Sequence, residues 1–280
     1  MSYPFLKGHG TENDFVLLPD HDGSVHGDLS ITRVRALCDR RAGIGGDGVL
    51  RVIRTSALLV VEEVALRPSR NHPTDDVAEW FMDYRNADGS LAEMCGNGIR
   101  VFAKHLYDEG LVPADEPVRV ATRAGVKTVT RRGDRLTADV GEASILGETK
   151  VSVGDRSWPA THVMVGNPHA VALVDDLAEA GSLREEPAYD EHLYPDGVNV
   201  EFVVRRGPDH VAMRVHERGS GETRSCGTGA CAAAIAAAPE GAGRWRVDVP
   251  GGRLEVSRDE AGHVYLTGPA VIVAWGETDL

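Results

Sequence analysis

The chain has 280 residues and a formal net charge of −13, with 42% hydrophobic and 26% charged residues. This length allows two ordinary domains or one large one, and the composition is typical of a soluble globular protein. The acidic balance argues against a nucleic-acid-binding protein, which normally carries a basic face. Because no apolar run approaches the ~18 residues of a membrane span and the start lacks a signal-peptide core, we expect a cytoplasmic protein without a membrane partner.

The first half is predicted to open with an extended segment, residues 14–18, and a helix whose N-cap is Ser30 or Thr32. A glycine-rich turn at 43–48 leads into a strand, and residues 55–79 are expected to form an irregular or helical excursion. The later segments alternate apolar and polar residues, as strands do. The strands expected in this half are 49–53, 80–84, 118–121, 126–129 and 136–140.

The second half repeats this order loosely. Asn167-Pro168-His169 precedes a strand at 170–174, as Asn13-Asp14 precedes the strand at Phe15. Residues 196–202 echo residues 47–52, since both begin Asp-Gly-Val. Further strands are expected at 212–216, 245–249, 252–256 and 264–266. Many short strands around one helix per half predict an α+β fold of two pseudo-symmetric halves, each wrapping a central helix.

Each half also contains a Cys-Gly-x-Gly motif, at Cys95 and at Cys226, which runs into a helical stretch. A helix N-terminus favours an anion and therefore a thiolate. The repeat predicts a symmetric two-thiol active site, with the two helix starts facing each other across an interdomain cleft. Cys38 and Cys231 are expected to be small buried hydrophobes. No cysteine has zinc-ligand spacing, so no metal is expected.

At these residues the chain resembles the diaminopimelate epimerases, amino-acid epimerases that work without pyridoxal phosphate. The matching segments run in the family's order over nearly the whole chain: 8–18, 43–48, 86–106, 166–171, 197–202 and 214–234. The resemblance implies two lobes, each a mixed or antiparallel barrel-like sheet around a central helix. They are 1–139 plus 269–280, carrying Cys95, and 140–268, carrying Cys226. It also implies a homodimer that interconverts LL- and meso-diaminopimelate without a cofactor, on the bacterial route to lysine and peptidoglycan.

The resemblance further implies roles for individual residues. Cys95 and Cys226 are the catalytic acid–bases, and His169 and Glu217 tune them. Substrate contacts are implied for the side chains of Asn13, Asn86, Asn167, Asn199, Glu217 and Arg218, and for the backbone at Gly96, Asn97, Gly227 and Thr228. The chain departs from many relatives at Thr11-Glu12, where they have Leu-Gly, and at Gly48, where they have a substrate-contacting glutamine.

Epimerisation removes the α-proton from one face of the substrate and returns a proton to the other, so two chemically similar groups on opposite sides suit it. A free cysteine has a pKa of ~8.5, and a helix end contributes about 0.3–1 kcal/mol, which lowers that value by roughly one unit. The helix ends alone therefore lower the thiol pKa too little to activate the thiols. We therefore expect His169 and Glu217 to act as accessory bases that take the thiol proton.

Other readings stay open. A related racemase could act on another diamino acid or on histidine. A thiol–disulfide redox protein normally has a CxxC motif, which is absent, and a phosphate-binding module would lack the Gly-Lys-Ser/Thr of a P-loop. If the Cα atoms of Cys95 and Cys226 come within ~7 Å, a regulatory disulfide could also form.

Overall fold

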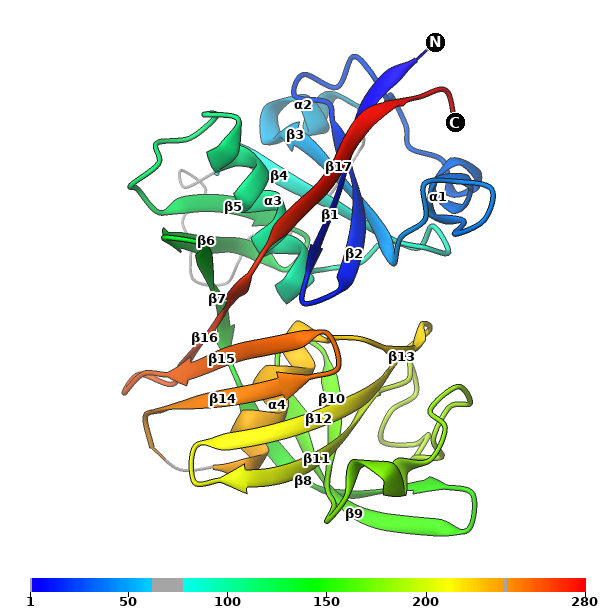
Figure 1. The fold of residues 1–280 in the computed structure, drawn as a ribbon, viewed down its shortest axis with the longest axis vertical. Coiled ribbons are helices and arrows are strands. Elements are labelled where there is room, and N and C mark those ends of the chain that lie inside the picture. The colour runs from blue at the N-terminus through cyan, green and yellow to red at the C-terminus, as the bar shows by residue number, and fades with distance from the viewer. Residues whose placement is uncertain (1, 62–77, 239–240) are drawn as a thin grey trace. The chain divides into compact units, whose positions relative to one another are not determined.

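The computed structural model describes residues 2–61, 78–238 and 241–280 (Figure 1). The chain forms two compact units, the first of Met1–Gly10, Asp14–Ala138 and Pro269–Leu280, the second of Thr11–Asn13 and Asp139–Gly268. The lobe limits expected from the sequence differ from these units at Thr11–Asn13 and at Asp139, and remain a prediction. Within the described ranges, no helix is both long and apolar enough to cross a membrane.

In its described residues, the first unit contains a sheet and three helices. Its strands are β1 (Tyr3–Gly10), β2 (Asn13–Pro19), β3 (Gly48–Arg54), β4 (Trp80–Asn86), β5 (Val118–Thr122), β6 (Gly125–Arg132), β7 (Arg135–Glu142) and β17 (Val271–Thr278). Its helices are α1 (Ile31–Cys38), α2 (Thr55–Val61) and α3 (Gly96–Asp108). Ser30 is the N-cap of α1, where its side chain accepts the Arg33 N–H. The excursion expected at 55–79 begins with α2, and its residues 62–77 lie outside the described residues.

The second unit has a similar composition of elements. Its strands are β8 (Ser144–Val153), β9 (Arg156–Met164), β10 (Pro168–Leu173), β11 (Asn199–Gly207), β12 (His210–Glu217), β13 (Gly221–Thr223), β14 (Gly243–Val249), β15 (Gly252–Arg258) and β16 (His263–Pro269). A 3₁₀ turn, η1 (Leu177–Ala180), and the helix α4 (Gly227–Ala237) complete it. The strands expected from alternation in both halves are all present.

The two units repeat one pattern of strand pairing. In the first, β2–β3 and β4–β5 are parallel, and β1–β17, β3–β4, β5–β6 and β6–β7 are antiparallel. In the second, β10–β11 and β12–β14 are parallel, and β8–β9, β9–β10, β11–β12, β14–β15 and β15–β16 are antiparallel. Helix α3 precedes β5 as α4 precedes β14. The predicted α+β fold of two similar halves is confirmed.

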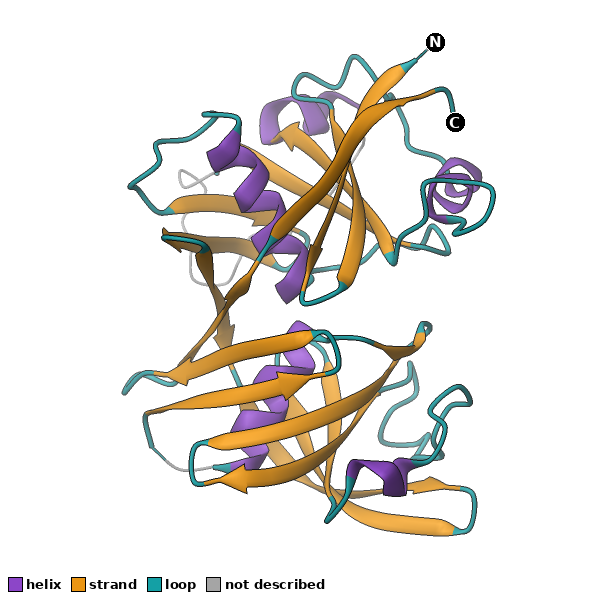
Figure 2. Ribbon diagram, in the orientation of Figure 1, coloured by secondary structure: helices purple, strands orange, loops and turns teal. Residues whose placement is uncertain are grey.

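Each unit wraps its sheet around one helix (Figure 2). Helix α3 packs against β1, β3, β4, β5, β6 and β17, and α4 packs against β9, β10, β11, β12, β14 and β15. Phe102 and Leu106 of α3 are fully buried in the first core. Helix α4 is alanine-rich and buried on every side, which suits its position inside the sheet because alanine combines high helix propensity with small volume. Both central helices therefore begin at positions held firmly by surrounding strands.

Strand register identifies the equivalent residues of the two units. Phe15 lies beside Gly48 on β2 and β3. His169 lies beside Asn199 on β10 and β11. Asn13 and Asn167 stand two residues before Phe15 and His169, so Phe15 corresponds to His169 and Gly48 to Asn199. The sequence echo that set Gly48 against Gly197 was therefore wrong by two positions (199 − 197 = 2). The shared letters misled because Gly197 lies in a turn at φ 83°, whereas Gly48 already begins a strand.

A tight hairpin joins β1 to β2 through Thr11 and Glu12. Both residues have positive φ, 51° and 63°, as the two-residue turns of β-hairpins require. This conformation is unfavourable for a β-branched threonine. Thr11 Oγ1 lies 2.6 Å from Ser225 Oγ, and Glu12 pairs with Arg224 at 2.6 Å. These contacts hold the strained turn that leads into Asn13.

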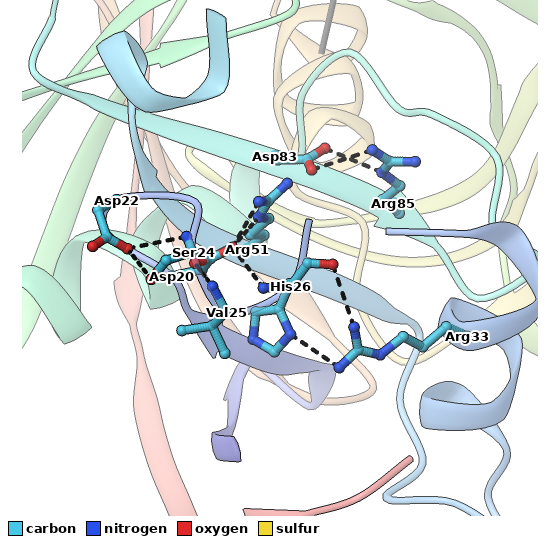
Figure 3. A network of polar contacts seen from close by, with 9 residues as sticks. All are labelled: Asp20, Asp22, Ser24, Val25, His26, Arg33, Arg51, Asp83 and Arg85. Carbon is cyan, nitrogen blue, oxygen red and sulfur yellow. Dashed lines mark hydrogen bonds and ion pairs between the residues drawn. The ribbon is translucent and has the colours of Figure 1, made fainter. Parts of the chain in front are cut away.

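A buried network of ion pairs fixes the outer face of the first sheet (Figure 3). Arg51 Nη2 and Asp20 Oδ2 lie 2.6 Å apart, with both side chains fully buried. The other Asp20 oxygen accepts the Val25 N–H at 2.9 Å. Because side chains alternate along β3, Arg51 points away from the face on which Leu50 contacts the core around α3. The network therefore anchors β3 without entering the candidate site.

Candidate active site

Cys95 is the N-cap of α3. Its backbone is extended, at φ −136° and ψ 120°, and its Sγ accepts the Gly98 N–H at 3.3 Å. Gly96 and Asn97 fill the first two helical positions, where backbone N–H groups point out of the helix end and can bind an anion. The thiol is half-buried. This arrangement matches the helix start that the sequence predicts.

Cys226 repeats this geometry at the start of α4. Its backbone has φ −113° and ψ 121°, and its Sγ accepts the Gly229 N–H at 3.3 Å. The Thr228 hydroxyl lies 3.6 Å from the same sulfur. Gly227 and Thr228 take the places of Gly96 and Asn97. The sequence thus builds the same sulfur-capped helix start twice, once in each unit.

The surroundings of Cys226 favour the neutral thiol. Burial raises its pKa well above the ordinary value, and the nearby carboxylates of Glu217 and Glu201 raise it further. The hydrogen bonds from Thr228 and from the Gly229 N–H act in the opposite direction but are smaller. The helix start was expected to favour thiolate. At Cys226 that effect is outweighed, because a charged sulfur would be buried beside two acidic groups.

His169 lies at the centre of a buried polar chain. Its Nδ1 is 2.6 Å from Glu201 Oε1, and its Nε2 is 3.0 Å from Asn167 Oδ1. Both His169 and Glu201 are fully buried, whereas Asn167 is only half-buried. The register of β10 and β11 explains the contact, since Glu201 lies two residues beyond Asn199, the partner of His169, and so on the same face of the sheet.

Asn199, Glu217 and Arg218 gather where β11 and β12 meet. Asn199 donates to the Pro168 carbonyl and accepts the Arg218 N–H, both at 3.1 Å. Its amide therefore joins β10, β11 and the end of β12. Glu217 accepts a short hydrogen bond from the Thr223 hydroxyl. The exposed Arg218 donates to the Asp196 carbonyl at 3.1 Å and lies across Gly197, which has no side chain to obstruct it.

Two further predicted residues lie in the first unit, which carries Cys95; the predicted site residues of each unit are its half-site. Asn86 ends β4, and its Nδ2 donates to Ser90 Oγ at 3.0 Å. Asn97 is fully buried, and its Oδ1 accepts from Arg100 Nη2 at 2.9 Å. Arg100 also donates to the Gly96 carbonyl at 2.9 Å and is itself fully buried. A buried guanidinium therefore supports the turn that carries Cys95.

Asn13, the remaining expected site residue, and the other two cysteines are all buried. Asn13 is buried at the start of β2 and groups with the second unit. Cys38 and Cys231 are buried as expected, and burial raises the pKa of Cys38 to about 12. All four cysteines are thiols. Among the described residues, no group of three His, Cys, Asp or Glu side chains could hold a metal ion. The predicted approach of Cys95 and Cys226 across a cleft remains a prediction.

Sequence reasoning missed Glu201 and Arg100. Each is a charged residue inside an otherwise apolar run, Val200 to Phe202 and Ile99 to Val101. A charge at an inward position of a core element is the signal that could have found them, because charged residues are almost never fully buried unless paired. Their partners come from the strand register and the helix turn, which the sequence pattern alone did not supply.

The chain is similar to known proteins over nearly its whole length. A sequence model of the family described as diaminopimelate epimerase matches residues 5–146 and 161–273. The diaminopimelate epimerase of Streptomyces coelicolor is 55% identical, over 98% of this chain and 95% of that protein. The diaminopimelate epimerase of Thermobifida fusca is 49% identical, over 99% of this chain and 98% of that protein.

Solved structures share the fold at much lower identity. A PhzF-family phenazine biosynthesis protein from Bacillus anthracis has a TM-score of 0.69 at 14% identity, with both chains covered completely (100%). A hydroxyproline epimerase from Agrobacterium vitis has a TM-score of 0.62 at 15% identity, covering 99% of this chain and 92% of that one. The family match and the relatives extend over nearly the whole chain, including both cysteine motifs. The chain belongs to the diaminopimelate epimerase family.

Proposed function

We propose that this chain interconverts LL- and meso-diaminopimelate, without a bound cofactor, by removing the α-proton with one thiolate and delivering a proton to the opposite face from the other thiol. The observation that carries the proposal is the duplicated helix start, in which Cys95 Sγ and Cys226 Sγ each accept the N–H of the glycine three residues later at 3.3 Å. Two chemically alike groups suit a reaction whose forward and reverse directions exchange acid and base.

The two thiols need different protonation states at the start of each turnover. The raised pKa of Cys226 supports a resting state in which this residue is the proton donor. Cys95 then removes the α-proton in the direction that begins from this state, and the roles exchange in the reverse direction. Glu217, whose negative charge raises the pKa of Cys226, takes the thiol proton when Cys226 must act as base, and His169 serves as the second accessory base.

The helix starts also supply the anion site. The backbone at Gly96-Asn97 and at Gly227-Thr228 binds the α-carboxylate, which anchors the substrate and stabilises the carbanion-like transition state. The distal ammonium and carboxylate are held by side chains with donors and acceptors: Asn13, Asn86, Asn167, Asn199, Glu217 and Arg218. Asn199 is already fixed by two backbone contacts, which support a precisely placed amide.

We also propose a cytoplasmic homodimer on the route to lysine and peptidoglycan. An apolar strip on β17 supports self-association, since Trp275 is 83% exposed and Val273 is 56% exposed. Light scattering after size-exclusion chromatography should give twice the chain mass of 30.0 kDa. Trp275→Glu should shift the protein toward the monomer. A monomeric wild type would contradict this part of the proposal.

The substrate is tested with a panel of amino acids assayed for epimerisation without added cofactor. We expect turnover of LL- and meso-diaminopimelate and little of single-headed amino acids, because the latter lack the distal groups that the asparagines and Arg218 would bind. The runner-up is a racemase for another diamino acid or for histidine. Activity on one of these, with none on diaminopimelate, would reject the first choice in its favour.

A further inference from the structure

The two half-sites differ behind their cysteines. Residues equivalent to the His169–Glu201 pair are Phe15 and Leu50 in the first unit, as the registers of β2–β3 and β10–β11 show. Phe15 and Leu50 are fully buried and belong to the apolar core around α3. A buried acid–base pair thus replaces two hydrophobic residues in the second unit only. Replacing a core contact by a buried charge costs stability, so a functional reason is expected.

The glycines of the helix starts confirm the equivalence and show how close Glu201 lies. A Cβ built on Gly98 would meet Leu50 Cδ2 at 3.3 Å, whereas one on Gly229 would meet Glu201 Oε1 at 2.6 Å. The carboxylate therefore packs directly on the backbone of Gly229, whose N–H donates to Cys226 Sγ. Glu201 touches the turn of the catalytic thiol and the imidazole of His169 at once.

The hydrogen bonds of His169 indicate which of its ring nitrogens carries a proton. Glu201 Oε1 lies 2.6 Å from His169 Nδ1, and a carboxylate in this place is an acceptor for an Nδ1–H, which leaves Nε2 as the nitrogen that can exchange a proton. In the described part of the chain, Glu201 Oε2 has no hydrogen-bond partner, so the contact of Oε1 with His169 Nδ1 orients the carboxylate. Asn167 faces Nε2 at 3.0 Å and offers an oxygen or, after rotation of its amide, an N–H group. His169 can therefore gain or lose a proton at Nε2 without losing its partners.

We propose that Glu201 is a positioning residue for the epimerase reaction, which holds His169 with its proton on Nδ1 and its Nε2 available for proton transfer beside Asn167. This inference rests on the proposed function, because it assigns Glu201 a part in that reaction. The polar contact of Glu201 is with His169 Nδ1, so its orienting effect passes through that ring, in addition to the effect of its charge on Cys226. In the first unit, Phe15 and Leu50 stand in these two places.

The test is Glu201→Gln, which keeps the shape and a hydrogen-bond acceptor but removes the charge. We expect kcat to fall about 10- to 100-fold with KM changed less than about threefold, by analogy with groups that orient metal-binding histidines, whose removal costs about that much activity. The acidic side of the kcat/KM profile should also change shape, with Cys226, Glu217, His162 and Tyr194 as other titratable groups near this pair. Glu222→Gln, an exposed carboxylate paired with Arg214 on β13 and β12, is the matched control and should behave as wild type.

Two further measurements separate positioning from simple loss of structure. In ¹⁵N-histidine spectra, the downfield Nδ1–H proton of His169, identified by its absence in His169→Gln, should move upfield in Glu201→Gln. In the His169→Gln background, Glu201→Gln should cause no additional loss of kcat. An unchanged resonance, or equal losses in both backgrounds, would overturn the inference while wild-type epimerase activity stands. An inactive wild type would instead overturn the proposed function.

Discussion

Gly98 and Gly229 occupy the third position of the two central helices, and a methyl group added at each would meet different surroundings. At Gly229 the new Cβ would lie 2.6 Å from Glu201 Oε1 and 3.1 Å from Cys226 Cβ. At Gly98 the nearest atoms would be 3.3 Å away, on Cys95 and Leu50. We therefore predict that Gly229→Ala is damaging and that Gly98→Ala is mild.

The size of the effect follows from how little Glu201 can move. Its side chain is fully buried and hydrogen-bonded to His169 at 2.6 Å, so the methyl group must displace either that contact or the Cys226 turn. Overpacking costs about 1–3 kcal/mol, and losing a hydrogen bond to a charged group costs about 1.5–3 kcal/mol. Alanine in a helix returns about 0.5–1 kcal/mol. Gly229→Ala should lower the free energy of unfolding by about 2–5 kcal/mol, and Gly98→Ala should change it by less than about 1 kcal/mol.

Urea unfolding followed by circular dichroism gives the two free energies, and epimerase kinetics on the same preparations give the catalytic effect. Gly229→Ala should also lose kcat, because the methyl group disturbs the His169–Glu201 contact. Gly98→Ala is the matched control, since it adds the same methyl group at the equivalent helix position. Equal effects at the two glycines, or a wild-type Gly229→Ala protein, would refute the close packing of Glu201 on this turn.

Three other predictions concern groups outside this contact. Iodoacetamide should label Cys226 more slowly than the half-buried Cys95 between about pH 7 and 9, because burial and neighbouring carboxylates raise the pKa of Cys226; faster labelling of Cys226 by peptide mass spectrometry would contradict this. The free energy of unfolding of Glu12→Gly should be about 1 kcal/mol higher than that of Glu12→Ala, since both variants lose the ion pair but only glycine is unstrained at φ 63°. Burial and Arg33 lower the pKa of His26 to about 4, below the unfolded value of 6.5, so its contribution to stability is complete above 6.5 and is lost as the pH falls toward 4. Urea unfolding of His26→Gln should show a shallower loss across this range, and an unchanged slope would refute the assignment.

Much of the fold could be predicted because its strands alternate and its central helices follow a repeated motif. The hairpin of β8 and β9 was not predicted. Most of β8 is exposed from Ser144 to Glu148, so it lacks the alternating burial that marks a strand. Strand β17 was missed for a similar reason, since Val273, Ala274 and Trp275 are successively exposed. Both strands are specified by long-range pairing rather than by their own pattern.

The site was predictable to the extent that it is local. Each Cys-Gly-x-Gly turn forms its own sulfur cap within four residues, and the sequence located both. Glu201 is different, because its partner His169 is 32 positions away and the two meet only through the parallel register of β10 and β11. The sequence echo aligned β3 with β11 two positions out of register. A two-residue shift keeps each side chain on the same face of the sheet, but it no longer sets Glu201 against Leu50, its true counterpart.

The electrostatics also needed the structure. A helix N-terminus alone predicts a thiolate, and the sequence analysis already found that effect too small. The burial of Cys226, then the charge of Glu217 and, on β11, the Glu201 carboxylate reverse the expected direction at this thiol. Neither burial nor that carboxylate could be read from the motif itself, since both arise from strands that surround α4.

The central claim is that one thiolate removes the α-proton while the other thiol donates a solvent-derived proton, and solvent deuterium exchange during epimerisation tests it most directly. In deuterated water, the wild type should place deuterium at the epimerised α-carbon of diaminopimelate without added cofactor. Cys95→Ala and Cys226→Ala should each reduce epimerisation at least about 100-fold, because each variant removes the acid–base group that serves one face of the substrate. Full turnover in either variant would contradict the two-thiol account.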